Sequence, residues 1–517
     1  MAKTRTIDYI MCIANASRWK ALLVVSVFVG CALIGILHCL RFSARLTRDE
    51  PAFGWAFLLL GAVFIALLTG LAVAKRKDLP LEYVFLILFG PLSLCMMVAM
   101  PMFGAPDEEL HLSMSYVVSS GQMFSASKQV DLPCNMHAAP SPADLMTIRE
   151  SLNCLASGDD FADDRMRMKL NEQIRVYPAL AYLPQGISMG IVRCLFGNRY
   201  ASFYAARLGS IFVSALMLFF AIRWTPCGKN IILAASVFPM SLQETASASC
   251  DGLAIACVTL LCAFVLRSRL PGFSMSWRHW VVACLLAVGL VCFKVFYIPF
   301  LAAFLLVGKE ACNGRRWRLL VLVACAAAAA LFSWWILSIR PLMNEDASRV
   351  STQVMAQLAA IRSDSLLVPK ILLKTFAENA EIYIRHMVGI SLSWFNAQLP
   401  YYVNTGVIAA TFAIVLKDRS LCGMPGEGLV RFVFFTLTAV SAAMVALSLL
   451  VWWTAPGSET IGGIQGRYFL PLFFAGALSL GFADRFGTDA YPKLWVCHAF
   501  LLFFDVCALA ALVSWKI

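Results

Sequence analysis

The sequence predicts an all-α polytopic membrane protein, and three observations support this fold class. Of the 517 residues, 60% are hydrophobic and only 14% are charged, whereas soluble domains carry roughly 25% charged residues. The apolar residues are gathered in long blocks, several of them about 20 residues in length, which is enough for a helix to cross a bilayer. These blocks lack the short alternating segments that are typical of a membrane β-barrel.

The first 80 residues are expected to hold a cytoplasmic start and two additional spans, at about 21–40 and 52–74. No cleavable signal peptide is evident, so the first span would serve as the insertion signal. The basic run at 75–77 is typical of a cytoplasmic loop, which places the N-terminus inside. The net charge of +12 is explained by topology and lipid headgroups, and it does not indicate nucleic-acid binding.

The main unit is expected over 81–485, where a third span at about 81–103 leads into a long outer loop at about 104–202. Within that loop, the apolar stretch 177–197 can also be counted as a span. Pro184 and Arg193 interrupt it, however, and a span here would place the basic loops that follow on the outer face. We therefore expect 177–197 to be an interfacial helix on the outer face.

The remaining apolar blocks predict spans at about 203–224, 229–246, 252–267, 279–293, 295–308, 318–338, 402–417, 429–453, 468–483 and 494–515. Residues 279–308 are too long for one span, so two short tilted helices that meet near Lys294 are expected. A second outer loop at about 339–400 includes an amphipathic surface helix at 368–390. The total is about thirteen spans, with the last in a C-terminal region, 486–517, that ends outside. No nucleotide-binding motif occurs.

Under this topology, the first group of candidate catalytic or metal-binding residues follows the third span. Asp107 and His111 are four residues apart and therefore share one helix face. The Asp107 carboxylate could act as a general base, or it could bind a divalent cation such as Mg or Mn together with Glu108, His111 and Asp251. Ordinary helix capping by Asp107, with Glu108 in the first turn, explains the same pattern.

Three further features fall at the same predicted face. Gln243, Glu244 and Asp251 lie in the connection between two spans, where capping of the next helix is again an alternative. Lys294 stands inside an apolar run, which indicates either a functional site or a side chain that reaches the headgroups. Arg467 adjoins Gln465 and Tyr468 near several glycines, and it could bind a phosphate oxygen or anchor the helix at the interface.

Acids that can act on a hydroxyl, cations for a phosphate and a lipid-facing scaffold together indicate group transfer from a lipid-linked phosphate donor. A leaving phosphate gains negative charge, and Lys294 and Arg467 would offset it.

In the outer loop, Cys134 and Cys154 could form a disulfide, because that compartment is oxidising, or they could remain two free thiols.

The same places in the chain resemble a known family of bacterial membrane proteins, domain of unknown function 2142. The resemblance covers about 81–485 and is carried by Ala105-Pro106-Asp107-Glu108 with His111, Tyr177-Pro178, Tyr182-Leu183-Pro184-Gln185, Ala206-Arg207-Leu208, Pro239-Met240, Ser247-Ala248-Ser249-Cys250-Asp251, Lys294, and Gln465-Gly466-Arg467-Tyr468-Phe469-Leu470-Pro471. That family looks like a branch of the GT-C glycosyltransferase superfamily. The resemblance implies a GT-C-like fold, polyprenyl-phosphate-linked sugar donors and an essential acid in the first outer loop, which Asp107 matches. Asp251 matches the acid of the second loop. This chain departs from the superfamily in one respect, because two predicted spans precede the span that leads to Asp107, whereas the superfamily usually has one span in total before the first outer loop.

The expected function is therefore a glycosyltransferase of the bacterial cytoplasmic membrane, which moves a sugar to a cell-envelope glycan or protein on the outer face. Asp107 would be the base, with Glu108, His111 and Asp251 orienting the acceptor or holding a metal. The supporting residues would be Tyr177, Tyr182, Gln185, Gln243, Glu244, Gln465 and Tyr468. A flippase of lipid-linked sugars and a structural partner in an envelope complex are the alternatives.

The transferase hypothesis makes a geometric prediction about Asp107, Asp251, Lys294 and Arg467. A shared active site requires their side chains to lie within roughly 10–15 Å of Asp107, because reacting groups must come close together. Capping and interfacial anchoring instead predict residues scattered around the rim of the bundle. We expect the cavity to lie under the helices at 177–197 and 368–390 and to open sideways to lipid.

Overall fold

The computed structural model describes most of the chain. The described residues are 51–122, 129–133, 147–157, 165–169, 177–308, 347–364, 366–418, 423–481 and 494–516, with a few isolated positions between them. The expected first span, nearly all of the span expected at 318–338, and Cys134 lie outside these residues. The two spans and the Cys134–Cys154 disulfide therefore stay predictions.

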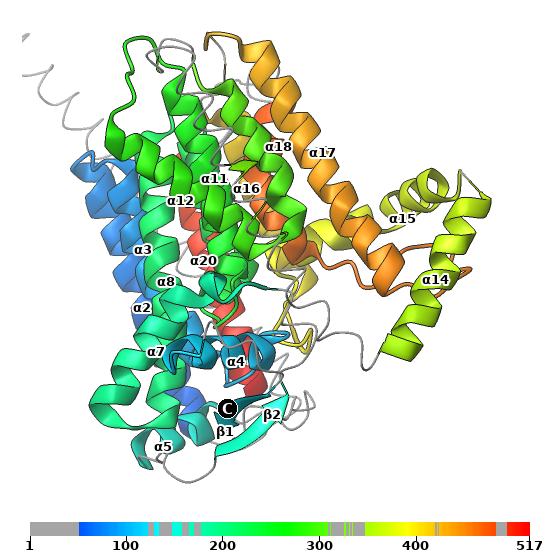
Figure 1. The fold of residues 1–517 in the computed structure, drawn as a ribbon. Helices are drawn as coiled ribbons and strands as arrows, with labels where there is room; N and C mark the ends of the chain where they lie inside the picture. The colour runs from blue at the N-terminus through cyan, green and yellow to red at the C-terminus, as the bar shows by residue number, and fades with distance from the viewer. Residues whose placement is uncertain are drawn as a thin grey trace, which may run out of the picture.

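Long helices run side by side and form the frame of the molecule (Figure 1). They are α2 (Pro51–Arg76), α3 (Leu81–Ala99), α8 (Arg199–Trp224), α11 (Asp251–Ser268), α12 (Trp277–Phe293), α16 (Tyr401–Lys417), α17 (Glu427–Trp452) and α20 (Leu494–Lys516). Each begins and ends within a few residues of a predicted span. The agreement arises because Pro, Gly and charged residues bound each apolar block, and these residues also end helices.

Two predicted spans depart from a simple α-helix. The stretch 229–246 is divided into α9 (Lys229–Ser236) and α10 (Pro239–Thr245), because Pro239 has no backbone N–H to continue the hydrogen bonding of α9. The stretch 468–483 starts as the 3₁₀ helix η4 (Gly466–Leu472) and continues as α18 (Phe473–Leu480). Both interruptions place irregular backbone inside the bundle.

The prediction of two short helices that meet near Lys294 is confirmed. Helix α12 ends at Phe293, Lys294 is extended with φ −153°, and the 3₁₀ helix η3 (Val295–Leu306) follows. A 3₁₀ helix rises about 2 Å per residue, so the 12 residues of η3 extend about 24 Å. This is close to the length of about 25 Å that the 17 residues of α12 span.

Among the described residues, seven helices are long and apolar enough to cross a membrane. They lie at Leu58–Arg76, Leu81–Ala99, Ala179–Phe196, Arg199–Trp224, Asp251–Ser268, Glu427–Trp452 and Leu494–Ser514. Shorter apolar helices lie at Trp277–Phe293, Val295–Leu306, Tyr401–Lys417 and Gly466–Leu480. A membrane protein built almost entirely of helices is thereby confirmed, whereas the count of about thirteen spans stays a prediction.

The stretch expected to be interfacial forms η2 (Ala179–Tyr182) and α7 (Leu183–Phe196). By length and composition this stretch could also cross a membrane. Its start packs beside the middle of α8, where Gly209 faces the backbone of Pro184, and α8 begins three residues after α7 ends. The two helices therefore form a hairpin in which α7 covers only the first half of α8.

The loop end of the bundle carries α4 (Glu108–Ser119), α5 (Ile148–Ser157) and the hairpin of β1 (Gln129–Pro133) with β2 (Arg165–Lys169) (Figure 1). At the opposite end, the turns between helices meet. Asp418 there accepts hydrogen bonds from the backbone of Asn230 at 2.6 Å and of Ile231 at 3.0 Å, and Arg269 donates to Leu306 O at 2.7 Å. The end of α16 therefore lies beside the start of α9, and the end of α11 lies beside the end of η3.

The second predicted outer loop contains α14 (Ala347–Ser363), α15 (Leu367–Val388) and a small hairpin of β3 (Ser391–Leu392) with β4 (Ala397–Gln398). Helix α15 confirms the helix predicted at 368–390, whereas α14 was not expected. Both helices project from the side of the bundle (Figure 1). Leu373 is exposed on α15, which is consistent with a helix on a membrane surface.

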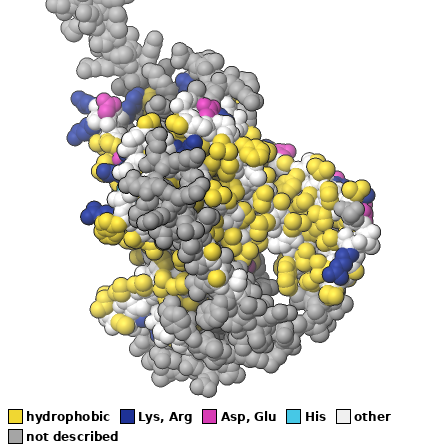
Figure 2. Space-filling view, turned by 45° about the horizontal axis from the view of Figure 1, so that its top comes forward, with side chains coloured by type: hydrophobic (Ala, Val, Ile, Leu, Met, Phe, Trp, Pro, Cys, Tyr) yellow, Lys and Arg dark blue, Asp and Glu magenta, His cyan; other side chains and the backbone are white. Residues whose placement is uncertain are grey.

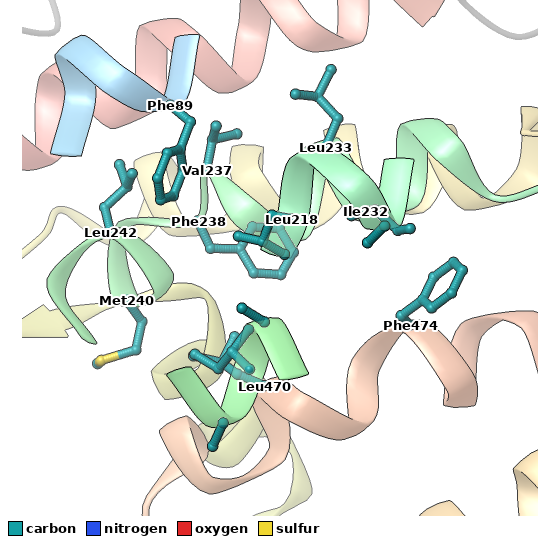
Figure 3. Packing of buried hydrophobic residues seen from close by; sticks show 14 of the residues in the cluster. Phe89, Leu218, Ile232, Leu233, Val237, Phe238, Met240, Leu242, Leu470 and Phe474 are labelled. Carbon is teal, nitrogen blue, oxygen red and sulfur yellow. The ribbon is translucent and has the colours of Figure 1, made fainter. Parts of the chain in front are cut away.

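The centre of the bundle is packed with apolar side chains around the break between α9 and α10 (Figure 3). Phe89 of α3 and Phe238 are fully buried, and the Phe238 ring meets that of Phe473 edge to face at 5.4 Å. On the face in Figure 2, the described side chains are mainly apolar, and charged side chains lie near the edges of the view. Phe212 and Phe432 are exposed, which is typical of helices that face lipid.

One acid lies deep in the bundle apart from the other charged groups. Asp505 of α20 is 1% exposed, and neither of its carboxyl oxygens has a hydrogen-bond partner among the described residues. Such a group costs roughly 1–3 kcal/mol when buried without a partner. It therefore gives a direct test of the packing of α20.

We expect Asp505→Leu to raise the apparent melting temperature of the purified protein in detergent, because the substitution removes a buried polar group that lacks a partner. Asp505→Asn keeps the size and polarity of the side chain and is the matched control. Thermal unfolding followed by tryptophan fluorescence measures both. A lower melting temperature for the leucine variant would contradict the packing described here.

Candidate functional site

Asp107 lies where the chain turns from α3 into α4, and its carboxylate pairs with Arg467. Arg467 Nη2 donates to Asp107 Oδ2 at 2.9 Å, and Nη1 donates to Pro106 O at 3.3 Å. The Asp107 side chain is 48% exposed, whereas that of Arg467 is 4% exposed. Asp107 makes no side-chain capping bond to α4, and its backbone is left-handed with φ 64°. Helix capping therefore does not account for this acid.

Asp251 and Lys294 form a second ion pair. The Lys294 Nζ lies 2.5 Å from Asp251 Oδ1, and both side chains are largely buried. Lys294 stands at the break between α12 and η3, and Asp251 is the first residue of α11. Since the ammonium group points to an acid inside the bundle, Lys294 does not extend to the lipid headgroups.

Tyr468 connects the two ion pairs. The Lys294 Nζ lies 5.0 Å from the centre of its ring, and the Arg467 guanidinium carbon lies 5.4 Å from the same centre. The Tyr297 hydroxyl donates to Tyr468 O at 2.9 Å, which fixes η4 against η3. The structure thus brings all four predicted charged residues to one site, and they do not scatter around the rim of the bundle.

Glu108 has a structural environment that the sequence did not predict. Its carboxylate accepts from Arg207 Nε at 2.9 Å and Nη2 at 2.7 Å, and Oε1 also accepts from the backbone of Ala248 at 3.0 Å. Both Glu108 and Arg207 are fully buried. With its oxygens engaged in this way, Glu108 is placed to hold the fold together, and it does not face the space beside Asp107.

Arg207 extends this interaction to the end of α3. Its Nη1 donates to Met97 O at 2.9 Å and to Met100 O at 2.6 Å, and its Nη2 donates to Pro101 O at 2.7 Å. These carbonyls lack partners in the helix because α3 ends there. Arg207 was part of the family motif but had no assigned role, because nothing in the local sequence indicates which acid it meets.

His111 faces a group of buried hydroxyls. Its Nδ1 lies 2.6 Å from the Tyr182 hydroxyl, and the rings of His111 and Tyr177 have centres 5.8 Å apart. Burial lowers the pKa of His111 to about 4, although Asp251 and Asp107 oppose this shift. The imidazole is therefore neutral near pH 7, and it can exchange a hydrogen bond with Tyr182.

The polar residues predicted to support the site occupy its walls. Gln185 Nε2 donates to Ser249 O at 3.0 Å, and Gln243 Oε1 accepts from the backbone of Ser393 at 2.6 Å. Glu244 Oε1 lies 3.7 Å from Arg467 Nη1. Among the described residues, Glu244 Oε2, Gln185 Oε1 and Gln465 Oε1 are buried without a hydrogen-bond partner.

The proposed metal ligands do not assemble. Among the described residues, no three His, Cys, Asp or Glu side chains are grouped so that they could hold a metal ion. The set of Asp107, Glu108, His111 and Asp251 fails because Glu108 is bound to Arg207 and Asp251 to Lys294. The expectation of a metal site built from these four residues is therefore corrected.

A narrow pocket with about 210 Å³ of empty space adjoins the Asp107–Arg467 pair. It is lined by Pro106, Met240, Gln243, His386, Ser393, Phe395, Gln465, Gly466 and Arg467. Helix α15 covers it, since Gly466 lies directly against the backbone of Tyr383 and Met387. The predicted cover by 368–390 is thereby confirmed, whereas no residue of 177–197 lines this pocket.

Glu109, the residue after Glu108, is a buried acid to which the sequence analysis assigned no role. It is 4% exposed, and its Oε2 has no hydrogen-bond partner among the described residues. Burial raises the pKa of Glu109 from its ordinary value of 4.5 to about 7, and the charges of Asp107 and Glu108 add to this shift. Its place in the first turn of α4 suggested only a favourable helix end.

The first prediction from this site concerns the buried ion pair of Glu108 and Arg207, which we call the clamp. Glu108→Ala is expected to destabilise the protein by roughly 3–5 kcal/mol, because it leaves the Arg207 charge buried without its carboxylate. The double variant Glu108→Gln/Arg207→Met should lose less than the single variant, since no charge remains unpaired. Apparent melting temperatures in detergent measure all three proteins. Equal losses in the single and double variants would show that the clamp is not the cause.

The second prediction concerns pH. In the folded state Glu109 keeps its proton up to about pH 7, whereas the unfolded chain releases it near pH 4.5. Stability from this group is therefore present below pH 4.5 and is lost as the pH rises through 7. The Glu109→Gln variant should become more stable relative to the wild type across this window. A difference in melting temperature that stays constant with pH would contradict the assignment.

Comparison with known proteins adds one finding. Residues 92–475 match the family DUF2142, described as a predicted membrane protein, and this region contains every charged residue of the site. No curated protein and no solved structure matches the chain. The match extends over more than half of the sequence, so the chain belongs to the DUF2142 family of predicted membrane proteins.

Proposed function

We propose that this protein is a membrane glycosyltransferase that moves a sugar from a polyprenyl-phosphate-linked donor to a cell-envelope glycan or protein. The observation that carries this proposal is the arrangement at Tyr468. A half-exposed carboxylate, Asp107, pairs with the buried cation Arg467, and Arg467 and the second buried cation, Lys294, lie against one aromatic ring. Such a set can take a proton from a hydroxyl and offset the charge of a leaving phosphate.

In the proposed reaction, the acceptor hydroxyl gives its proton to Asp107 while its oxygen forms a bond to the anomeric carbon of the sugar. The bond between that carbon and the phosphate oxygen breaks, and the polyprenyl phosphate leaves with the electron pair. The attack comes from the face opposite the leaving group, so the configuration of the anomeric carbon is inverted. Asp107 suits the base role because its side chain remains the most accessible of the charged groups in the site.

Charge matching assigns the donor phosphate to Lys294 and Arg467. Both cations are already paired, Lys294 with Asp251 and Arg467 with Asp107 and Glu244. A phosphate would therefore share these cations with the acids or displace one of them. Described residues offer no group of three metal ligands, so a divalent cation at this site would need oxygen ligands from the substrate.

Entry of the proposed lipid-linked sugar donor requires the elements that cover the pocket to move. In the state described, the pocket beside Arg467 is too narrow to admit even a water molecule, whereas pockets for small ligands hold roughly 300–1,000 Å³. Helix α15 and the β3–β4 hairpin contribute residues to its wall, and α15 projects from the side of the bundle (Figure 1). We infer that these elements shift outward when a polyprenyl chain approaches from the lipid.

The proposal places the site on the outer face of a bacterial cytoplasmic membrane, with the N-terminus inside and the C-terminus outside. Support for this orientation comes from the basic run at 75–77, which is typical of a cytoplasmic loop. Lys75 belongs to α2 at the end opposite the loop end, where its ammonium lies over the Trp495 ring. The resemblance to GT-C enzymes, and about thirteen spans, belong to the same proposal.

Flippase activity for lipid-linked sugars is the second candidate, and the broken helices favour it. The chain is interrupted between α9 and α10, at Lys294 and within 466–480. Transporters often bind substrates at such interrupted helices. A flippase would use the cations for the phosphate but would have no need of Asp107 as a base.

Asp107→Asn separates the two candidates. Asparagine tolerates the left-handed backbone found at this position, so the variant should fold, bind polyprenyl-phosphate-linked sugar nearly as the wild type does, and lose transfer by at least about a hundredfold. Asp78→Asn is the matched control, since Asp78 is exposed, lies outside the site and is also left-handed with φ 47°.

The measurement is transfer of radiolabelled sugar by the full-length protein in liposomes, together with a lipid-scrambling assay on the same vesicles. Full transfer by Asp107→Asn would eliminate the proposed base. Movement of labelled lipid across the bilayer without a transfer product would favour the flippase.

A further inference from the structure

The pocket beside Arg467 carries two buried polar atoms without hydrogen-bond partners among the described residues. They are Gln465 Oε1, which can only accept a hydrogen bond, and Arg467 Nε, which can only donate one. Both residues line the same pocket. Buried polar atoms rarely lack partners, so an open donor and an open acceptor on residues of one pocket indicate a group that can complete both bonds.

Two aromatic rings also line the pocket. The rings of His386 and Phe395 are stacked at 28°, with their centres 5.5 Å apart. His386 comes from the end of α15, and Phe395 comes from the turn between β3 and β4. Pockets that combine an aromatic surface with a few well-placed polar groups are typical of small-ligand sites. A purely apolar guest such as a lipid tail would leave Gln465 and Arg467 unsatisfied.

Backbone strain is concentrated around this pocket. Among the described residues, five non-glycine positions have positive φ, namely Asp78, Phe103, Asp107, Ser393 and Phe395. All except Asp78 lie in the two loops at the pocket. These loops are joined, because Ser393 Oγ donates to Gly104 O at 2.7 Å and Trp394 Nε1 donates to Phe103 O at 2.9 Å. Strain of this kind is maintained where surrounding contacts enforce a particular shape.

We propose that this pocket is a subsite for a hydroxylated ring, in which a sugar hydroxyl donates to Gln465 Oε1 and accepts from Arg467 Nε while the ring lies against Phe395. A hydroxyl group is the simplest partner that both donates and accepts. The proposal rests on the proposed function for its substrate class. The ring belongs either to the lipid-linked donor or to the acceptor glycan.

The test uses the full-length protein in lipid nanodiscs and measures ligand binding by native mass spectrometry. One arm compares polyprenyl phosphate with the same lipid carrying a hexose or a pentose. The other arm adds a panel of methyl glycosides in the presence of bare polyprenyl phosphate. A preference for sugar-bearing lipid would assign the ring to the donor, and binding of a methyl glycoside would assign it to the acceptor.

Variants of two lining residues report on the pocket. Gln465→Met keeps the shape of the side chain but removes the amide, and Phe395→Leu removes the ring. Each should weaken the sugar-dependent binding by roughly tenfold while leaving bare polyprenyl phosphate unaffected. Gln398→Ala, an exposed position on the same hairpin, is the matched control and should bind every probe as the wild type does. Apparent melting temperatures show that each variant is folded.

Three results would overturn the subsite. The first is that both variants bind sugar as strongly as the wild type does, and the second is that they lose binding of bare and sugar-bearing lipid equally. The third is that the wild type shows no sugar-dependent binding in either arm. Sugar-dependent binding that is sensitive to Gln465 but is accompanied by no transfer would support the subsite and count against the transferase. The two proposals can therefore fail separately.

Discussion

The buried pair of Glu108 and Arg207 is the interaction on which the arrangement of the site depends. Arg207 satisfies carbonyls at the end of α3 and both oxygens of Glu108, and Glu108 in turn accepts from Ala248 in the turn before α11. One fully buried contact thereby fixes α3, α4, α8 and α11 relative to one another. Asp107 is the neighbour of Glu108 and Asp251 follows the turn at 248, so the clamp positions both acids of the site.

Irregular backbone supplies the cations. Lys294 reaches the site because α12 ends there in an extended residue, and Arg467 does so because η4 is a 3₁₀ helix that lies against α15. Backbone groups freed at such breaks must be satisfied inside the bundle, since lipid offers no hydrogen bonds. The contact of the Tyr297 hydroxyl with Tyr468 O is one example. The same breaks would suit a transporter, which is why the proposed base matters for assigning the chemistry.

Both cations of the site are paired with acids in the state described. Lys294 lies against Asp251, and Arg467 lies against Asp107 and Glu244, so the proposed substrate would compete with contacts that already exist. This pairing lets two cations be buried without substrate, because an unpaired charge in the bundle would be costly. Under the proposed function, phosphate binding would release an acid, which would make Asp107 available when the donor is bound.

Sequence alone determined the helical membrane class, the bounds of most spans, the amphipathic helix α15 and the identity of the charged residues, because hydropathy and helix-ending residues are local signals. Only the tertiary structure decided which acid each cation meets. Glu108 pairs with Arg207 from 99 positions away, and Asp107 with Arg467 from 360 positions away. The burial of Glu109, the strained hairpin at 391–398 and the division of α9 from α10 likewise depend on packing between distant segments. Local patterns show that a residue can bear charge, whereas only the packed bundle decides whether that charge clamps the fold or faces the pocket.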